Sequence, residues 1–263
     1  MPRDFLNRRR FLHPDAPKED MLKKVLFIGD IHGRFDWRET ANEGLKKFQE
    51  VVLLGDYWDS FDISSALQKD NFYQVLSFVK KKKNVTALLG NHDYAYIHAF
   101  SSISGYQFSQ APIIKKIFED NKGVFKIAWG YTDSNGNYTL ATHAGLTYGF
   151  WKKNVLPLFE EGQFLHQIFD GKEPGELPIH EVLNALIDKS SLMWKVGYAR
   201  GGYGNPSPLW ADYRELLDDP FPGINQVVGH TVNHAPSVDL TKEGIIARVD
   251  NWGPKTASLV LGI

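Results

Sequence analysis

Aspartate, histidine and asparagine side chains recur directly after short apolar runs of this 263-residue chain. Gly29-Asp30-Ile31-His32-Gly33, Gly55-Asp56-Tyr57-Trp58-Asp59 and Gly90-Asn91-His92-Asp93 follow the first three runs, and Thr142-His143-Ala144-Gly145 and Gly229-His230-Thr231 follow two later ones. Carboxylate, amide and imidazole groups are ligand types for divalent transition metals. The chain has no cysteine, so a metal here must be held by oxygen and nitrogen atoms.

The segments between the motifs predict the elements that must position them. Val25–Ile28, Val51–Leu54 and Val85–Leu89 are short and uniformly apolar, which is typical of buried strands. Trp37–Glu50 and Ser64–Lys83 between them predict helices. In a sheet with helical crossovers the carboxyl ends of the strands form the functional edge. The three early motifs are therefore expected to meet at one edge.

The second half of the chain predicts more strands. Val124–Trp129 and Tyr138–Thr142 flank an Asn-Gly pair, which is a hairpin signal. Further helices are expected at Phe150–Asp170 and Pro178–Ser190, and further strands at Gln226–Val228, Gly244–Val249 and Ala257–Leu261. The pattern predicts an α/β domain over residues 23–263.

Composition narrows the function classes. Thirty Lys and Arg against 31 Asp and Glu leave a net charge of −1, which disfavours binding to extended nucleic acid. No apolar window reaches the length of a membrane helix, so we expect a soluble, cytoplasmic protein without a membrane partner. Residues 1–22 are expected to form a flexible basic arm, because Arg8-Arg9-Arg10 is followed by a polar, proline-containing segment and not by the apolar stretch of an export signal.

The motifs GDIHG, GDYWD, GNHD, THAG and GHT, in that order, resemble the signature of the calcineurin-like metallophosphoesterases. The single terminal GHT resembles the phosphoprotein-phosphatase branch with its bacterial and phage members, and Val249-Asp250 resembles the strand that commonly follows. The resemblance implies a four-layer α/β/β/α sandwich of two mixed sheets flanked by helices.

The resemblance also implies roles for individual residues. Asp30 and His32 would bind a first metal ion, and Asp56 would bridge both ions. Asn91, His143 and His230 would bind the second ion, and His92 would be the general acid, oriented by Asp59. Mn²⁺ is the expected ion, with Fe or Zn as alternatives, because nitrogen and oxygen sites discriminate poorly among these metals. A water molecule between two such cations loses a proton near neutral pH and becomes the nucleophile.

The chain departs from the family pattern where the substrate phosphate would bind. Ser60 and Phe61 follow Asp59 where relatives have Arg-Gly, and Leu89 precedes the third motif where relatives often have Arg. Arg34, Arg200 and Arg214 are candidate replacements, although each could equally be a solvated surface residue. Trp58 lies between two site carboxylates, and it is a candidate for lining the cleft and stacking on an aromatic group.

The expected activity is hydrolysis of phosphomonoesters, with a small molecule, a nucleotide or a phosphoprotein as substrate. A protein serine/threonine phosphatase is one form of this activity. The alternatives are a dinucleoside polyphosphate hydrolase, a nucleic-acid end phosphatase or a phosphodiesterase. A non-catalytic metal-binding module is a more distant alternative, since it would be expected to have lost ligands that are all present here.

Overall fold

The computed structural model describes residues 23–251 and 255–263, and the arm expected at residues 1–22 lies outside them. The strands are β1 (Lys24–Ile28), β2 (Glu50–Leu53), β3 (Val85–Leu88), β4 (Phe125–Lys126), β5 (Ala128–Thr132), β6 (Tyr138–Thr142), β7 (Ile224–Val228), β8 (Ser237–Leu240), β9 (Ile245–Arg248) and β10 (Ser258–Gly262). The α-helices are α1 (Trp37–Leu45), α2 (Ser65–Lys81), α3 (Asn91–His98), α4 (Ala111–Asp120), α5 (Tyr148–Phe150), α6 (Phe164–Ile168), α7 (Ile179–Ala185), α8 (Ser190–Met193) and α9 (Tyr213–Asp218).

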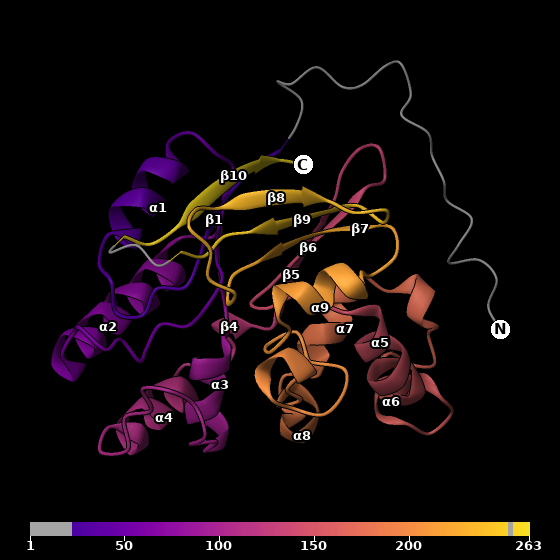
Figure 1. The fold of residues 1–263 in the computed structure, drawn as a ribbon, viewed down its shortest axis with the longest axis horizontal. Coiled ribbons are helices and arrows are strands. Elements are labelled where there is room, and N and C mark those ends of the chain that lie inside the picture. The colour runs from indigo at the N-terminus through magenta and orange to yellow at the C-terminus, as the bar shows by residue number, and fades with distance from the viewer. Residues whose placement is uncertain (1–22, 252–254) are drawn as a thin grey trace.

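The strands form two mixed five-stranded sheets (Figure 1). The first has the order β10-β1-β2-β3-β4, in which β1 to β4 run parallel and β10 pairs antiparallel with β1. The second has the order β5-β6-β7-β9-β8, with β6, β7 and β9 parallel and the two edge strands antiparallel. This is the α/β architecture of two mixed sheets that the sequence predicts.

Alternate residues of the strands face two different cores. Val25 and Phe27 of β1 pack with Trp129 and Val227 of the second sheet, so this core lies between the sheets. Their neighbours on β1 point to the opposite face, into the core shared with α1 and α2. Because both faces are covered, the strand is apolar throughout and does not alternate with polar residues. Helices α5 to α9 lie beside the second sheet (Figure 1).

The expected strand Val124–Trp129 is in fact two strands. Phe125–Lys126 pairs with β3 in the first sheet, whereas Ala128–Thr132 pairs with β6 in the second. At the break the side-chain oxygen of Asn184 accepts hydrogen bonds from the backbone N–H groups of Ile127 and Ala128, at 2.8 and 2.9 Å. These two donors are satisfied without a strand partner, so the chain can pass from one sheet to the other.

Three predicted helices have different bounds. The expected helix Phe150–Asp170 is a π-helical turn at Trp151–Val155, a 3-10 turn at Leu156–Phe159 and then α6. Pro157 has no N–H to donate to an α-helix, and Gly162 has a φ of 79° between the two parts. Residues 178–190 form the separate helices α7 and α8, and α1 ends at Leu45, because Glu50 already belongs to β2. Among the described residues, no helix has the length and apolar content to cross a membrane.

Candidate metal centre and general acid

The five motifs lie at the carboxyl ends of β1, β2, β3, β6 and β7, and Asn91 of the third motif is the first residue of α3. Within each sheet these strands are parallel neighbours, so their loops meet at one edge. Four motif residues have a left-handed backbone, with φ of 40° at His32, 49° at Asp56, 70° at Asp59 and 60° at His230. Such a conformation costs a non-glycine residue about 1 kcal/mol or more, and it is concentrated at functional sites. The backbone is therefore strained at the positions that direct these side chains toward one another.

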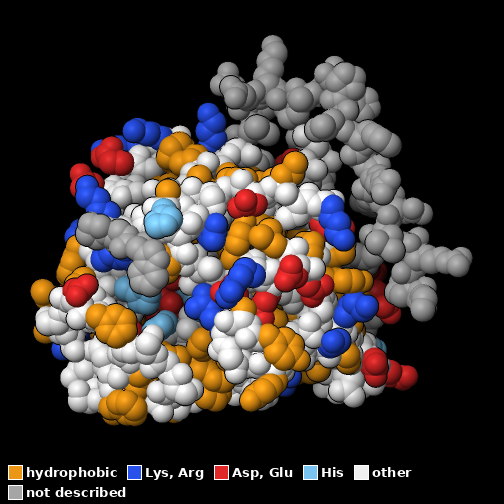
Figure 2. Space-filling model, in the orientation of Figure 1, with side chains coloured by type: hydrophobic (Ala, Val, Ile, Leu, Met, Phe, Trp, Pro, Cys, Tyr) orange, Lys and Arg blue, Asp and Glu red, His pale blue; other side chains and the backbone are white. Residues whose placement is uncertain are grey.

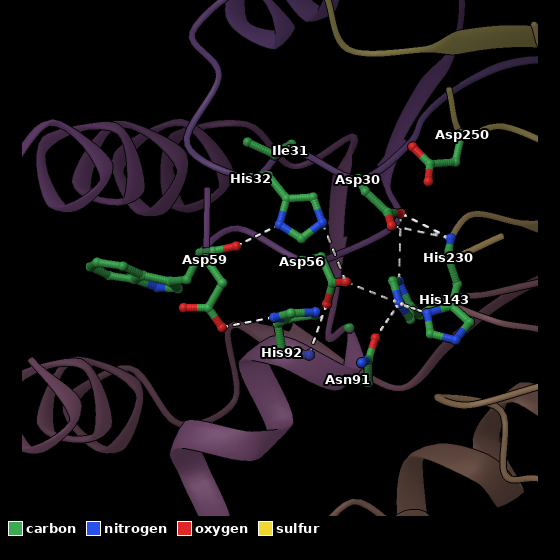
Figure 3. Close-up of polar contacts among 12 residues, drawn as sticks. Asp30, Ile31, His32, Asp56, Asp59, Asn91, His92, His143, His230 and Asp250 are labelled. Carbon is green, nitrogen blue, oxygen red and sulfur yellow. Dashed lines mark hydrogen bonds and ion pairs between the residues drawn. The ribbon is translucent and has the colours of Figure 1, made fainter. Parts of the chain in front are cut away.

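Two groups of potential metal ligands lie at this edge and share one carboxylate. Asp30, His32 and Asp56 form one group, and Asp56, His143 and His230 form the other, with ligand atoms inside each group within 4.8 Å of one another. Figure 3 shows the Asp56 carboxylate between the two groups. One Asp56 oxygen is 3.8 Å from His32 Nε2 and 3.4 Å from His143 Nε2. An anionic group in this position can serve two cations.

The two histidines nearest Asp56 have defined tautomers. His32 Nδ1 lies 2.6 Å from the Trp58 carbonyl oxygen, and His143 Nδ1 lies 2.9 Å from that of Leu54. A carbonyl oxygen only accepts, so each Nδ1 carries the hydrogen and each Nε2 presents a lone pair to the site. This second contact is the usual way in which a protein orients a metal-binding histidine.

Polar atoms of three other residues converge on His143 Nε2, which carries no hydrogen. Asn91 Oδ1 lies 2.9 Å from it, His230 Nδ1 3.1 Å and the nearer Asp56 oxygen 3.4 Å. Burial lowers the pKa of His143 to about 3 and that of His230 well below its ordinary value, so both rings are neutral at pH 7. The lone pairs of His143 Nε2, Asn91 Oδ1 and the Asp56 carboxylate face one another, and a cation among them would remove this repulsion. The donor set thus fits a divalent ion with nitrogen and oxygen ligands.

Buried carboxylates bring uncompensated negative charge to the same cluster. Asp30, Asp56 and Asp250 are each at most 3% exposed. Burial, together with repulsion between neighbouring carboxylates, raises the pKa of Asp56 well above its ordinary value and raises those of Asp30 and Asp250. Isolated buried anions are costly, so the cluster requires protons or cations for balance.

Two motif glycines leave the space that the carboxylates occupy. A Cβ atom on Gly90 would lie 2.0 Å from Asp56 Oδ1, and one on Gly229 would lie 2.3 Å from Asp30 Oδ1. No heavy atom tolerates such contacts. The glycines therefore allow the backbone of one motif to pass directly beside the ligand of another.

His92 lies next to the cluster with a carboxylate partner of its own. Its ring centroid is 5.2 Å from that of His32, and its Nδ1 is 2.7 Å from Asp59 Oδ2 (Figure 3). The backbone N–H of His92 donates to Asp56 Oδ1 at 2.9 Å. With Nδ1 engaged by Asp59, Nε2 is the ring nitrogen left for proton transfer.

Comparison with known proteins agrees with this geometry. The model of the calcineurin-like phosphoesterases matches residues 23–234, which is most of the chain. The chain belongs to this family. Calcineurin-like phosphoesterases are metal-dependent hydrolases, and the buried Asp and His cluster is the metal-binding part of this member. A search of curated proteins found no match.

Solved structures that are similar to this chain include protein phosphatases. A cold-active protein-tyrosine phosphatase from a psychrophilic Shewanella species is 17% identical, with a TM-score of 0.54, over 91% of this chain and 75% of its own. A point mutant of a cold-active protein-tyrosine phosphatase gives 18% identity and the same TM-score and coverage. A protein serine/threonine phosphatase from Saccharomyces cerevisiae is 16% identical, with a TM-score of 0.44, over 88% of this chain and 67% of its own. At these identities the first two likenesses concern the fold alone.

The three candidate arginines of this calcineurin-like phosphoesterase lie in different surroundings. Arg34 donates to the carbonyl oxygens of Ile31 and Asp30, at 3.1 and 2.9 Å, and so supports the first motif loop. Arg200 donates to the carbonyl oxygen of His230 at 3.3 Å and is 30% exposed. The side chain of Arg214 is 73% exposed and pairs at 2.8 Å with Asp212, two residues earlier in the sequence. Figure 2 shows histidine side chains gathered on one face with Lys and Arg side chains next to them.

Trp58 does not line the cleft. Its ring is 1% exposed and packs against Phe72 and Tyr96, with centroids 5.2 and 6.4 Å apart. Such a ring cannot stack on a substrate, so we withdraw Trp58 as a substrate-binding residue. What Trp58 supplies to the site is its carbonyl oxygen, which binds His32.

Two buried aspartates of the site had no role assigned from sequence. Asp93 accepts from the backbone N–H groups of Gly90, Asp56 and Tyr57 at 2.8–3.0 Å, so it ties the second motif loop to the third. An acid at the third position of a helix is a signal for this kind of cap. Asp250 follows β9 and points toward Asp30 (Figure 3). An acid shortly after a buried strand is the same pattern that marks the other motifs.

Proposed function

We propose that this calcineurin-like phosphoesterase hydrolyses phosphomonoesters with two divalent metal ions, and that Mn²⁺ is the natural ion. The observation that carries the proposal is the pair of ligand groups sharing Asp56, with the His92–Asp59 pair beside them. Asp30 and His32 would hold the first ion, and Asn91, His143 and His230 the second. Bound ions would polarise the phosphate group and acidify the attacking water.

His92 would protonate the leaving group. As a water oxygen bonds to phosphorus, the bond from phosphorus to the ester oxygen breaks and its electron pair goes to that oxygen. His92 Nε2 gives its proton to the same oxygen, so that an alcohol and not an alkoxide departs. The Asp59 carboxylate at Nδ1 holds the ring in this orientation.

Arg200 is our candidate for binding the substrate phosphate. Its Nε is 3.3 Å from Asp212 Oδ2, and its guanidinium also donates to Thr231 Oγ1 at 3.2 Å, so the side chain is held beside the last metal-binding motif. Arg200→Met is expected to raise KM and weaken inhibition by inorganic phosphate about tenfold, the order expected for one charge-assisted contact. Arg214→Met should change both values less. Equal effects of the two substitutions would contradict this assignment.

The activity is tested with a panel of substrates on the Mn²⁺-loaded protein. We expect turnover of p-nitrophenyl phosphate and a phosphopeptide, and none of bis(p-nitrophenyl) phosphate. Preference for the bis-ester or for diadenosine tetraphosphate would overturn the proposal in favour of a phosphodiesterase or a pyrophosphohydrolase. No turnover with two ions bound would favour a binding module.

His92→Asn separates the acid from the ligands. It is expected to lower kcat on phenyl phosphate at least about a hundredfold, with metal content unchanged, because general acid catalysis contributes effects of this size. The control is His234→Asn, at an exposed histidine four residues after His230. Loss of metal in His92→Asn would show that His92 is a ligand.

A further inference from the structure

The two oxygen atoms of Asp59 have different partners. Oδ2 binds His92 Nδ1 at 2.7 Å, whereas Oδ1 accepts a short hydrogen bond from the Tyr96 hydroxyl and lies 3.4 Å from Gln107 Nε2. We propose that Tyr96 is a positioning residue for leaving-group protonation, because it holds Asp59 in the orientation that His92 requires. The inference rests on the proposed function and extends it to a residue outside the family motifs.

Tyr96 and His92 come from the same face of one helix. They are four residues apart in α3, which begins at the proposed metal ligand Asn91. One helix thus supplies a metal ligand, the acid and the group that holds the partner of the acid. Asp59 reaches them from the loop after β2 and has a left-handed backbone. Because it belongs to no helix or strand, contacts of its side chain must hold it in place.

The Tyr96 hydroxyl has its hydrogen directed to Asp59. Its oxygen accepts a hydrogen bond from the backbone N–H of Gln107 at 2.8 Å. A backbone N–H cannot accept, so the hydroxyl hydrogen is donated to Asp59 Oδ1. Its ring is 1% exposed and stacks on Tyr106, with centroids 4.6 Å apart and planes at 13°. Ring and hydroxyl are both fixed, so the donor cannot rotate away from Asp59 without breaking several contacts.

Tyr96 acts as a donor and not as a base. Burial and the nearby charge of Asp59 raise the pKa of Tyr96, so its hydroxyl stays protonated. Asp59 itself is 2% exposed. Without Tyr96 its Oδ1 would have only Gln107 at 3.4 Å, and the carboxylate would be free to turn toward other donors. His92 would then lose a fixed partner.

The test is the dependence of rate on the leaving group. An ester with a good leaving group, such as 2,4-dinitrophenyl phosphate, needs little protonation, whereas phenyl phosphate needs it fully. We expect Tyr96→Phe, which keeps the ring, to lower kcat on phenyl phosphate about tenfold, because positioning accounts for part of the contribution of general acid catalysis. On the dinitrophenyl ester, kcat should change less than twofold. Metal content should match the wild type, and Tm should fall, because the backbone N–H of Gln107 and the Asp59 carboxylate each lose a partner. Tyr106→Phe is the control, because it removes a hydroxyl from the stacked neighbour.

The double variant distinguishes positioning through Asp59 from a general effect on structure. Once Asp59→Asn is present, Tyr96→Phe should cause no further leaving-group-dependent loss. Equal losses on both esters, or additive losses in the double variant, would overturn the proposal. If Tyr96→Phe does not fold, Gln107→Met provides a second test, because it removes Nε2 beside Asp59 Oδ1. This variant should lower kcat on phenyl phosphate about twofold more than on the dinitrophenyl ester. Equal rates of Gln107→Met and wild type on phenyl phosphate would count against the inference. A wild-type protein that hydrolyses neither ester would refute the proposed function instead.

Discussion

Asp56→Asn is expected to have opposite effects on the metal-free and the metal-loaded protein. The substitution keeps the size of the side chain, and the amide oxygen can still accept the backbone N–H of His92. Asparagine tolerates a φ of 49° as well as aspartate does, so the backbone strain is unchanged. What the substitution removes is one negative charge, at the position shared by the two ligand groups.

The two magnitudes follow from the surroundings of this charge. In the metal-free protein, burial and the carboxylates of Asp30 and Asp93 raise the pKa of Asp56. At pH 7.5 the native state must hold a proton there, which costs about 1.4 kcal/mol for each pH unit above the unfolded-state pKa, or it must bear the repulsion. Asp56→Asn should therefore raise the unfolding free energy of the metal-free protein by about 2 kcal/mol. Loss of a unit charge beside a divalent ion should weaken metal binding by about 4 kcal/mol, or about a thousandfold.

Urea unfolding in EDTA measures the first effect, and Mn²⁺ titration calorimetry measures the second. Asp62→Asn is a matched control, because it removes the same charge from an exposed position six residues later. A metal-free Asp56→Asn protein that is less stable than the wild type would refute the electrostatic argument. Unchanged affinity for both ions would show that Asp56 is not the shared ligand.

Two further predictions concern the crowding of the cluster. Gly90→Ala should abolish binding of at least one ion in calorimetry, because its Cβ would lie 2.0 Å from Asp56 Oδ1. Gly136→Ala is the control, since no atom lies within 4 Å of its added Cβ. It should cost only about 1 kcal/mol of stability, from its positive φ, and leave metal binding intact. The metal-free protein should lose stability as pH rises from 6.5 to 8, by up to about 1.4 kcal/mol per pH unit for each carboxyl group protonated only in the native state. The sign follows because the raised pKa values of Asp30 and Asp250 let the native state hold protons that the unfolded state has released. Histidines of the unfolded state are about half protonated at pH 6.5 and lose these protons by pH 8, which offsets only part of this loss. Urea midpoints at the two pH values, with and without Mn²⁺, check this, and a midpoint that rises in EDTA would contradict it.

The apolar runs of the sequence determined the α/β class, and the order of its motifs, through their resemblance to a family, implied the two sheets. Runs such as Val51–Leu54 are apolar on both faces, which requires a sheet covered on both sides, and each run is followed by a compact polar motif. These signals are local, so they can be read without knowing what each segment contacts. The same locality explains the error at Trp58, because its position between two acids says nothing about which way its ring points.

Only the tertiary structure decided which atoms meet. The tautomers of His32 and His143 depend on carbonyl oxygens of Trp58 and Leu54, and a carbonyl oxygen has no signature in the sequence. The break between β4 and β5 depends on Asn184, which is more than fifty residues away. Such contacts are formed by side chains and backbone groups from distant segments, and their geometry follows from packing of the whole chain. Residue type and spacing therefore predict the chemistry that is present, whereas the fold decides which groups are close enough to take part in it.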